Sequence, residues 1–97
     1  MKSVFPQAVQ DLPKVSVPFH GATGYVVQGK KEQVVFMQFE KDVDVPDHAH
    51  ESQWEIVLEG VVDYFQDGKK HTYKRGDQFF VPSGKKHAAH VYAGYSC

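Results

Sequence analysis

Two histidines separated by one residue, His48 and His50, lie in the segment PDHAHESQWEIVLEG at residues 46–60. On an extended chain, side chains two positions apart point to the same face, so both imidazole rings can reach a single ion. Imidazole nitrogen is a ligand that zinc, copper, iron and nickel all accept. The pair therefore predicts part of a binding site for a divalent metal ion.

A second segment, GDQFFVPSGKKH at residues 76–87, supplies a third histidine, His87. Gly76 is expected to close a turn, and Pro82 and Gly84 to form a tight turn just before His87 begins a strand. If the fold brings the two segments together, His87 completes the site that the other two histidines begin.

The two segments resemble the two motifs of the cupin superfamily, which read approximately G-x5-H-x-H-x3,4-E-x6-G and G-x5-P-x-G-x2-H-x3-N. The matching positions are His48, His50 and Gly60 in the first motif and Gly76, Pro82, Gly84 and His87 in the second. Both motifs occur in the right order, which makes the match specific. The resemblance implies an all-β, RmlC-like jelly-roll barrel (a double-stranded β-helix) that holds the ligands inside its mouth.

The fourth ligand is where the sequence departs from the family pattern. Counting back from Gly60 with the family's six-residue spacing leads to Gln53, where the family usually has Glu. Glu55 is the competing ligand, since four residues separate it from His50, as the family also permits. We favour Gln53, because some cupins carry Gln at this position.

A neutral amide ligand leaves the full charge of the ion uncompensated. Relative to a Glu site, this weakens metal affinity, increases Lewis acidity and disfavours the higher oxidation state of a redox metal. If Gln53 is the ligand, Glu55 points into the same cavity, where it orients a bound molecule or acts as a general base. The alternative is that Glu55 pairs with a Lys or His of the barrel. His90, three positions after His87, is a second candidate base at the cavity mouth, or else a surface or packed histidine.

Three functions fit this set of residues. We favour a metal-dependent isomerase or lyase that acts on a small polar metabolite, such as a carbohydrate or carbonyl compound. The alternatives are a metal-dependent dioxygenase and a non-catalytic metabolite-binding cupin. The cofactor is expected to be one divalent ion (Zn, Ni, Fe, Mn or Cu), among which the sequence does not choose.

The elements that must position these residues are strands. Short runs of β-branched and aromatic residues, separated by polar turns that contain glycine, occur at 24–29, 33–39, 54–58, 61–65, 71–73, 78–81 and 90–95. Only residues 9–12 suggest a helical turn. This pattern is typical of an all-β sandwich or barrel. We expect the phenylalanines at strand spacing to pack inside the barrel: Phe36, Phe39, Phe65, Phe79 and Phe80.

The length of 97 residues predicts one domain over 1–97, with an N-terminal segment at 1–23 and a barrel at 24–97. The last strand-like run ends close to the last residue, so the final strand is either abrupt or truncated. The sequence carries 11 basic and 12 acidic residues without a basic stripe, which argues against nucleic-acid binding. No apolar stretch is long enough for a membrane span, and no signal peptide is recognisable. The single cysteine, Cys97, favours a reducing, cytoplasmic setting.

The resemblance also bears on partners. Small cupins usually pair through sheet edges, so a homodimer that binds a small molecule is expected, with residues 1–23 as a natural edge or swapped element. Trp54, beside the predicted ligand Gln53, is read as a core or dimer-interface residue.

Overall fold

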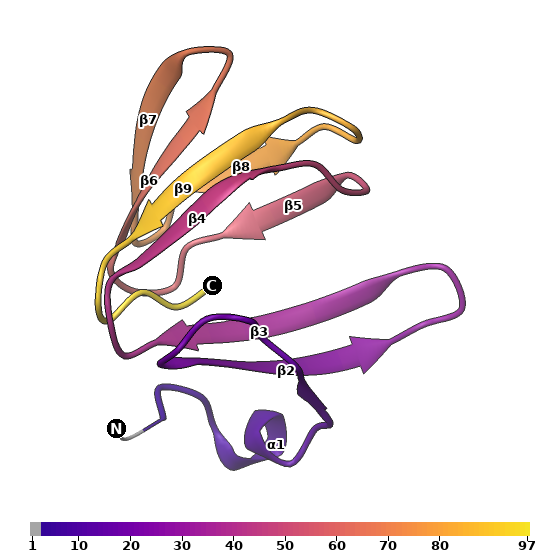
Figure 1. Cartoon of the computed structure of the whole chain (residues 1–97). Coiled ribbons are helices and arrows are strands. Elements are labelled where there is room, and N and C mark those ends of the chain that lie inside the picture. The colour runs from indigo at the N-terminus through magenta and orange to yellow at the C-terminus, as the bar shows by residue number, and fades with distance from the viewer. Residues whose placement is uncertain (1–2) are drawn as a thin grey trace.

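The computed structural model describes residues 3–97, and this part of the chain is nearly all β (Figure 1). One short helix, α1 (Gln7–Gln10), precedes the strands. The strands are β1 (Lys14–Val15), β2 (Ala22–Gln28), β3 (Gln33–Phe39), β4 (Val43–His48), β5 (Gln53–Ile56), β6 (Val61–Gln66), β7 (Lys69–Lys74), β8 (Gln78–Val81) and β9 (His87–Val91).

The strands form a jelly roll with two opposed walls. One wall is the antiparallel sheet β4-β9-β6-β7, and the other contains the sheet β1-β2-β3 and the pair β5-β8. The C-terminal residues join the parts of the second wall, because they lie between β3 and the chain that follows β5 (Figure 1). Met37 and Cys97 exchange backbone hydrogen bonds of 2.9 and 3.0 Å, and the Leu58 N–H donates to the Ser96 carbonyl at 2.8 Å.

The core fills the space between the walls. Alternation along β6 explains how the sequence builds it, since Val62 and Tyr64 face inward while Asp63 between them faces outward. Burying each such apolar side chain stabilises the fold by roughly 1.5–3 kcal/mol. The buried cluster consists of Phe39, Val43, Val57, Val62, Tyr64, Phe79, Val81, Val91 and Tyr95.

Backbone conformation explains one glycine of the first motif and one of the predicted turns. Gly60 has a φ of 82°, and a Cβ atom at this position would lie 2.7 Å from the Cα atom of Tyr95. Only glycine fits there, because a side chain would collide with the backbone of the C-terminal segment. One of the predicted polar turns that contain glycine, at residues 66–70, is a tight hairpin between β6 and β7, in which Asp67 and Gly68 both have positive φ.

The structure corrects two predictions about the strands. The run at 90–95 is not one strand, because β9 ends at Val91 and residues 92–94 turn the chain from one wall to the other. The segment that carries His48 forms a strand of its own, β4, although no strand was predicted at 43–48.

The prediction that five phenylalanines pack inside the barrel is right for Phe39 and Phe79, which are buried. It is wrong for Phe65 and Phe80, which face outward and are 38% and 61% exposed. Phe36 is half-buried but packs against Phe5 of the N-terminal segment, with ring centroids 5.8 Å apart. The strand pattern located these residues, but it did not determine which face of each strand the barrel would cover.

The described part of the N-terminal segment lies on the chain's own sheet. Phe5 is buried against Tyr25 and Phe36, and the Val4 N–H donates to the Gln38 side chain at 3.1 Å. β1 pairs with β2. Within residues 3–97, no helix has the length and apolar character that a membrane crossing requires.

Candidate metal centre

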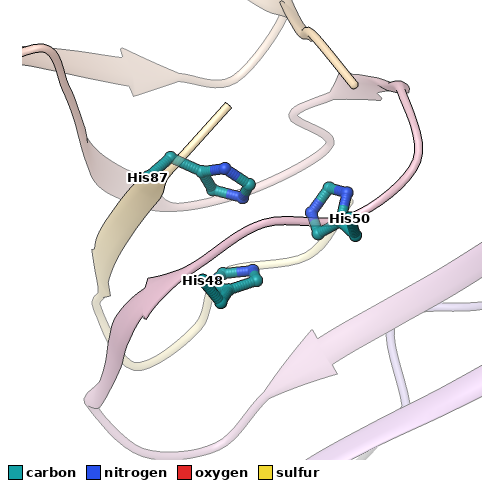
Figure 2. Close-up of side chains that lie close together, drawn as sticks. All are labelled: His48, His50 and His87. Atoms are coloured by element: carbon teal, nitrogen blue, oxygen red, sulfur yellow. The ribbon is translucent and has the colours of Figure 1, made fainter. Parts of the chain in front are cut away.

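Three histidines converge inside one end of the barrel (Figure 2). His48 ends β4, His50 lies in the following loop, and His87 begins β9 directly opposite His48. One ring nitrogen of each lies within 4.8 Å of the others. The structure thus brings together the three histidines that the sequence predicted, at a spacing that suits a single ion.

A bulge in β4 contributes to this convergence. The β4–β9 register shifts between Val45 and His48, and Pro46 within the bulge has no N–H to offer the ladder. Because a bulge inserts a residue and re-aims the side chains that follow, it turns His48 toward the interior that His87 also faces.

The backbone fixes the orientation of all three rings. Each Nδ1 atom lies against a carbonyl oxygen of a residue one or two positions away: Pro46 for His48 (2.9 Å), Glu51 for His50 (2.6 Å) and Lys85 for His87 (2.9 Å). A carbonyl oxygen only accepts, so each Nδ1 carries the hydrogen and each Nε2 keeps its lone pair. Such a second hydrogen bond is how proteins orient histidines that bind metals.

The ionisation of His87 is also compatible with metal binding. The residue is 5% exposed, and burial lowers the pKa of its imidazole, with the neighbouring His48 and His50 acting in the same direction. A neutral imidazole is the form that binds a metal ion. The donor set therefore fits a divalent cation of the kind that imidazole ligands prefer.

Gln53 and Glu55 are hydrogen-bonded to each other, and Glu55 also interacts electrostatically with His50 of the cluster. Gln53 begins β5, and its side-chain N–H donates to the Glu55 carboxylate at 2.9 Å. Because the amide N–H is used in this bond, the amide oxygen is the Gln53 atom that would bind a metal ion. The role of Gln53 as fourth ligand stays a prediction. The Glu55 carboxylate oxygens are not among the possible ligand atoms that lie within 4.8 Å of one another, which come from the three histidines.

The Glu55 carboxylate is held from a second side by Tyr95, whose hydroxyl donates to Oε2. Burial raises the pKa of Glu55, and the hydrogen bonds from Tyr95 and Gln53 partly oppose that rise. The sequence did not predict this contact, because the C-terminal run was interpreted as a continuous strand. Within residues 3–97, Glu55 is hydrogen-bonded to Tyr95 and Gln53, and the alternative of a Lys or His partner is represented only by a weaker electrostatic interaction with His50.

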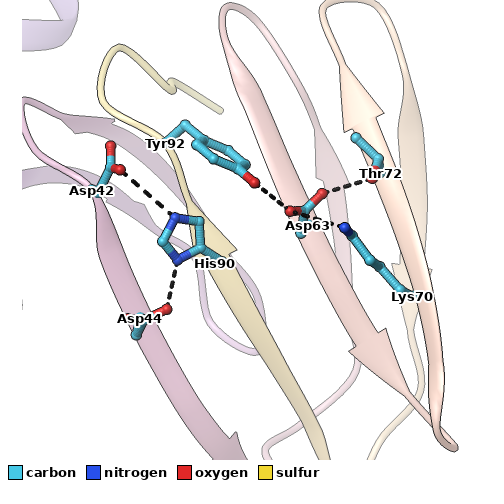
Figure 3. A network of polar contacts seen from close by, with 7 residues as sticks. All are labelled: Asp42, Asp44, Asp63, Lys70, Thr72, His90 and Tyr92. Atoms are coloured by element: carbon cyan, nitrogen blue, oxygen red, sulfur yellow. Dashed lines mark hydrogen bonds and ion pairs between the residues drawn. The ribbon is translucent and has the colours of Figure 1, made fainter.

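His90 does not join the site. It projects from the opposite face of β9, where its Nδ1–H donates to Asp44 at 2.6 Å and its Nε2 lies 3.7 Å from Asp42 (Figure 3). The hydrogen bond to Asp44 raises the pKa of His90. This position corrects the prediction of a base at the cavity mouth: residues three apart on a strand face opposite sides, so His90 cannot share the face of His87.

Comparison with known proteins agrees with this fold. Among solved structures, KdgF from Halomonas sp. aligns with a TM-score of 0.75 and 22% identity, over 99% of this chain and 87% of that one. An RmlC-like cupin from Shewanella frigidimarina aligns with a TM-score of 0.71 and 24% identity, over 90% and 79%. The polyketide cyclase RemF from Streptomyces resistomycificus aligns with a TM-score of 0.69 and 20% identity, over 100% and 74%.

A search of the curated proteins finds no match. The sequence profile of the cupin domain matches residues 34–93, a stretch that includes the three histidines and every motif glycine. The chain is therefore a member of the cupin family.

Proposed function

We propose that this cupin is a metal-dependent enzyme of the isomerase or lyase type, acting on a small polar metabolite such as a carbohydrate or carbonyl compound. The observation that carries the proposal is the shared arrangement of His48, His50 and His87, each with Nδ1 bound to a backbone carbonyl and Nε2 left free. Gathering three oriented nitrogen donors costs free energy in the absence of a cation, because their lone pairs lose the water molecules that they would otherwise bind.

In this proposal the three histidines hold one divalent ion and the Gln53 amide oxygen is the fourth ligand. Such an ion, when bound, supplies Lewis acidity that polarises a carbonyl or hydroxyl oxygen. All four donors are uncharged, and this favours polarisation over redox chemistry with O₂, because no ligand charge stabilises a higher oxidation state.

Glu55 is the residue proposed to hold or move a proton. Its carboxylate is oriented by Gln53 and by the Tyr95 hydroxyl, and it lies on β5 one inward position beyond Gln53. Burial raises its pKa, and hydrogen bonds from Tyr95 and Gln53 partly oppose that rise. That one protein of this fold is named a polyketide cyclase supports an enzymatic role for such a barrel.

The test begins with metal content. Purified protein is stripped of metal, dialysed separately against Zn²⁺, Ni²⁺, Mn²⁺ and Fe²⁺, and analysed by mass spectrometry for bound metal. We expect one ion per chain for at least one of these metals, and its loss in His48→Ala, His50→Ala and His87→Ala. His20→Ala is the matched control, since His20 is exposed and lies outside the cluster.

A second step separates the proposed chemistry from the alternatives. Candidate sugars and hydroxycarbonyl compounds are incubated with the loaded protein in D₂O, and deuterium incorporation next to the carbonyl is followed by NMR. Exchange that Glu55→Gln abolishes supports the proposal. Turnover accompanied by O₂ consumption in the iron-loaded protein would instead identify a dioxygenase, and binding without exchange or turnover a non-catalytic cupin.

We also propose that the chain forms a homodimer through the outer face of β5 and β8. Trp54 and Phe80 are directly opposite each other there and are 63% and 61% exposed. Together with Ile56 and Leu58, which are 43% and 42% exposed, they form an apolar patch. This patch offers roughly 400 Å², about half of what one partner contributes to a stable interface. We propose a second copy as the partner because a two-fold interface pairs a patch with itself, with the residues around the patch supplying the other half of the area.

A further inference from the structure

A row of inward-facing side chains crosses the sheet β4-β9-β6-β7 at the level of the histidines. His48 lies opposite His87, His87 lies opposite Gln66 on β6, and Gln66 lies opposite Lys69 on β7. Directly paired residues on neighbouring strands point to the same face of a sheet. Two of the candidate metal ligands are therefore followed, in the same row, by an amide and then by an ammonium group.

A cavity of about 330 Å³ lies along the second half of this row. Gln66 and Lys69 line it together with Tyr64, His71 and Tyr73, whose side chains occupy the next inward rows. The cavity adjoins the histidine cluster through Tyr64, because the Tyr64 and His87 ring centroids are 5.6 Å apart. A molecule that reaches from the histidines into this cavity would pass over Tyr64 and Gln66.

The polar groups of the cavity favour a negative charge. The Tyr64 hydroxyl donates to Gln66 Oε1 at 2.5 Å, so the amide N–H groups lie on the other side, where one of them donates to the Asp67 carboxylate and the second remains for a ligand. Lys69 forms no ion pair within 4 Å among residues 3–97, although its charge contributes to lowering the pKa of the nearby Asp67. The acidic residue in the lining, Asp67, is paired with Lys85 at 3.1 Å, which compensates its charge.

The strand spacing sets the length of the matching ligand. Neighbouring strands are about 4.8 Å apart, so the Lys69 backbone lies roughly 10 Å from that of His87. The long lysine side chain can fold back along the cavity, which brings its ammonium group to roughly one sugar-ring length from the histidines.

We propose that Lys69 and Gln66 form an anion-binding subsite of the ligand pocket. The preferred ligands are small metabolites with a carboxylate or phosphate group about one sugar ring from the oxygen atom that faces His48, His50 and His87. This inference rests on the proposed function, because it assumes that a ligand oxygen is held at the histidine cluster.

The test compares three probes that differ only at one carbon: glucose, glucuronate and glucose 6-phosphate. Each is titrated into zinc-loaded, ¹⁵N-labelled protein, and dissociation constants are obtained from NMR shifts. We expect at least one of the two anions to bind about fivefold or more tightly than glucose, the size of effect that a partly exposed charge pair supplies. A preference for glucuronate identifies a carboxylate ligand, and a preference for glucose 6-phosphate a phosphate ligand.

Variants of β7 assign the preference to Lys69. Lys69→Met is expected to abolish it and Lys69→Arg to keep it. Lys70→Met is the matched control, since Lys70 is the adjacent lysine on the outer face of β7, 3.7 Å from Asp63. NMR spectra of each variant report on folding, so a loss of preference in a folded Lys69→Met protein is attributable to the missing charge.

Three results would overturn the proposal: equal affinity for glucose and both anions, equal loss of the preference in the Lys69→Met and Lys70→Met variants, or no binding of any probe to zinc-loaded protein. Metal content measured on the same samples separates this failure from that of the proposed function. If zinc is retained without a charge preference, only the anion subsite is wrong, whereas if zinc is not held, the metal-dependent function itself is wrong.

Discussion

The imidazole rings of His48 and His87 lie with their centroids 4.3 Å apart, on strands that are directly paired. The two residues come from separate sequence motifs, and the β4–β9 ladder is what brings them together. The outer face of the same ladder carries a different set of polar residues, centred on His90 and Asp63 (Figure 3). The wall β4-β9-β6-β7 therefore separates a candidate metal centre inside the barrel from a charged network outside it.

The contact between Tyr95 and Glu55 predicts a loss of stability on removing one hydroxyl group. Tyr95 is 1% exposed, and its hydroxyl donates to the carboxylate of the half-buried Glu55. Tyr95→Phe should lower the free energy of unfolding by about 1.5–3 kcal/mol, as expected for a hydrogen bond to a charged group. The measurement is urea denaturation at pH 7.

Tyr73→Phe serves as the comparison, since Tyr73 packs flat on Phe79 with ring centroids 4.2 Å apart. That variant should change the free energy of unfolding by less than about 0.5 kcal/mol. Equal effects of the two substitutions would mean that the Glu55 hydrogen bond does not stabilise the fold.

The close approach of Gly60 to the C-terminal segment predicts a large effect of adding one methyl group. Gly60→Ala imposes both a strained φ and a collision with the backbone of Tyr95. We expect a loss of roughly 2–4 kcal/mol in the free energy of unfolding. Gly68→Ala isolates the strain, since Gly68 also has positive φ but no atom within 4 Å of the added Cβ. The second variant should lose only about 1 kcal/mol, and a similar loss in both would show that the contact with Tyr95 is unimportant.

The pair of His90 and Asp44 predicts a pH-dependent contribution to stability. Asp44, with smaller contributions from Asp42 and Asp63, raises the pKa of His90 in the folded state. A histidine with a raised folded pKa stabilises the fold fully below its unfolded pKa of about 6.5, and this stabilisation is lost as the pH rises through the folded pKa. Asp44→Asn should therefore destabilise the protein more at pH 5.5 than at pH 8.5.

An NMR titration of the His90 ring protons measures this directly. The pKa of His90 should fall in Asp44→Asn and stay unchanged in Asp11→Asn, which alters an exposed carboxylate on the helical turn at the N-terminal end. An unchanged pKa of His90 in the Asp44 variant would contradict the assignment of its main cause.

Much of the fold and of the candidate site could be predicted from sequence because both depend on local spacing. His48 and His50 are two residues apart, and the segment from Gly76 to His87 encodes its own turns, so the cupin motifs located the three histidines that the structure brings together. The alternation of side chains along β5 also placed Glu55 on the same face as Gln53, where the two side chains are hydrogen-bonded.

The remaining features depend on tertiary pairing that no local pattern carries. Tyr95 reaches Glu55 only because residues 92–94 turn the chain between walls, and a run of β-branched and aromatic residues does not reveal such a turn. Phe80 alternates with the buried Phe79 and Val81 along β8, and this alternation does not specify that the Phe80 face of the strand stays exposed. Lys69 lies in the row of His87 through two successive registers, which the sequence alone does not specify.

The apolar patch on β5 and β8 predicts a dimer that a single charge can dissociate. Phe80→Lys should convert the protein to a monomer in size-exclusion chromatography with light scattering, since an unpaired charge in an interface is strongly unfavourable. Phe65→Lys is the control, because Phe65 is also an exposed aromatic residue but lies on the other wall. A monomeric parent protein at micromolar concentration, or dissociation by both variants alike, would contradict the proposed interface.

The metal centre is the central claim, and a crystal structure of the zinc-loaded protein with data collected at the zinc absorption edge tests it most directly. We expect one anomalous peak, bonded to the Nε2 atoms of His48, His50 and His87 and to the amide oxygen of Gln53, with each Nδ1 still donating to its backbone carbonyl. A peak coordinated by Glu55 in place of Gln53 would correct the fourth ligand. The absence of a peak between the three histidines would contradict the account as a whole.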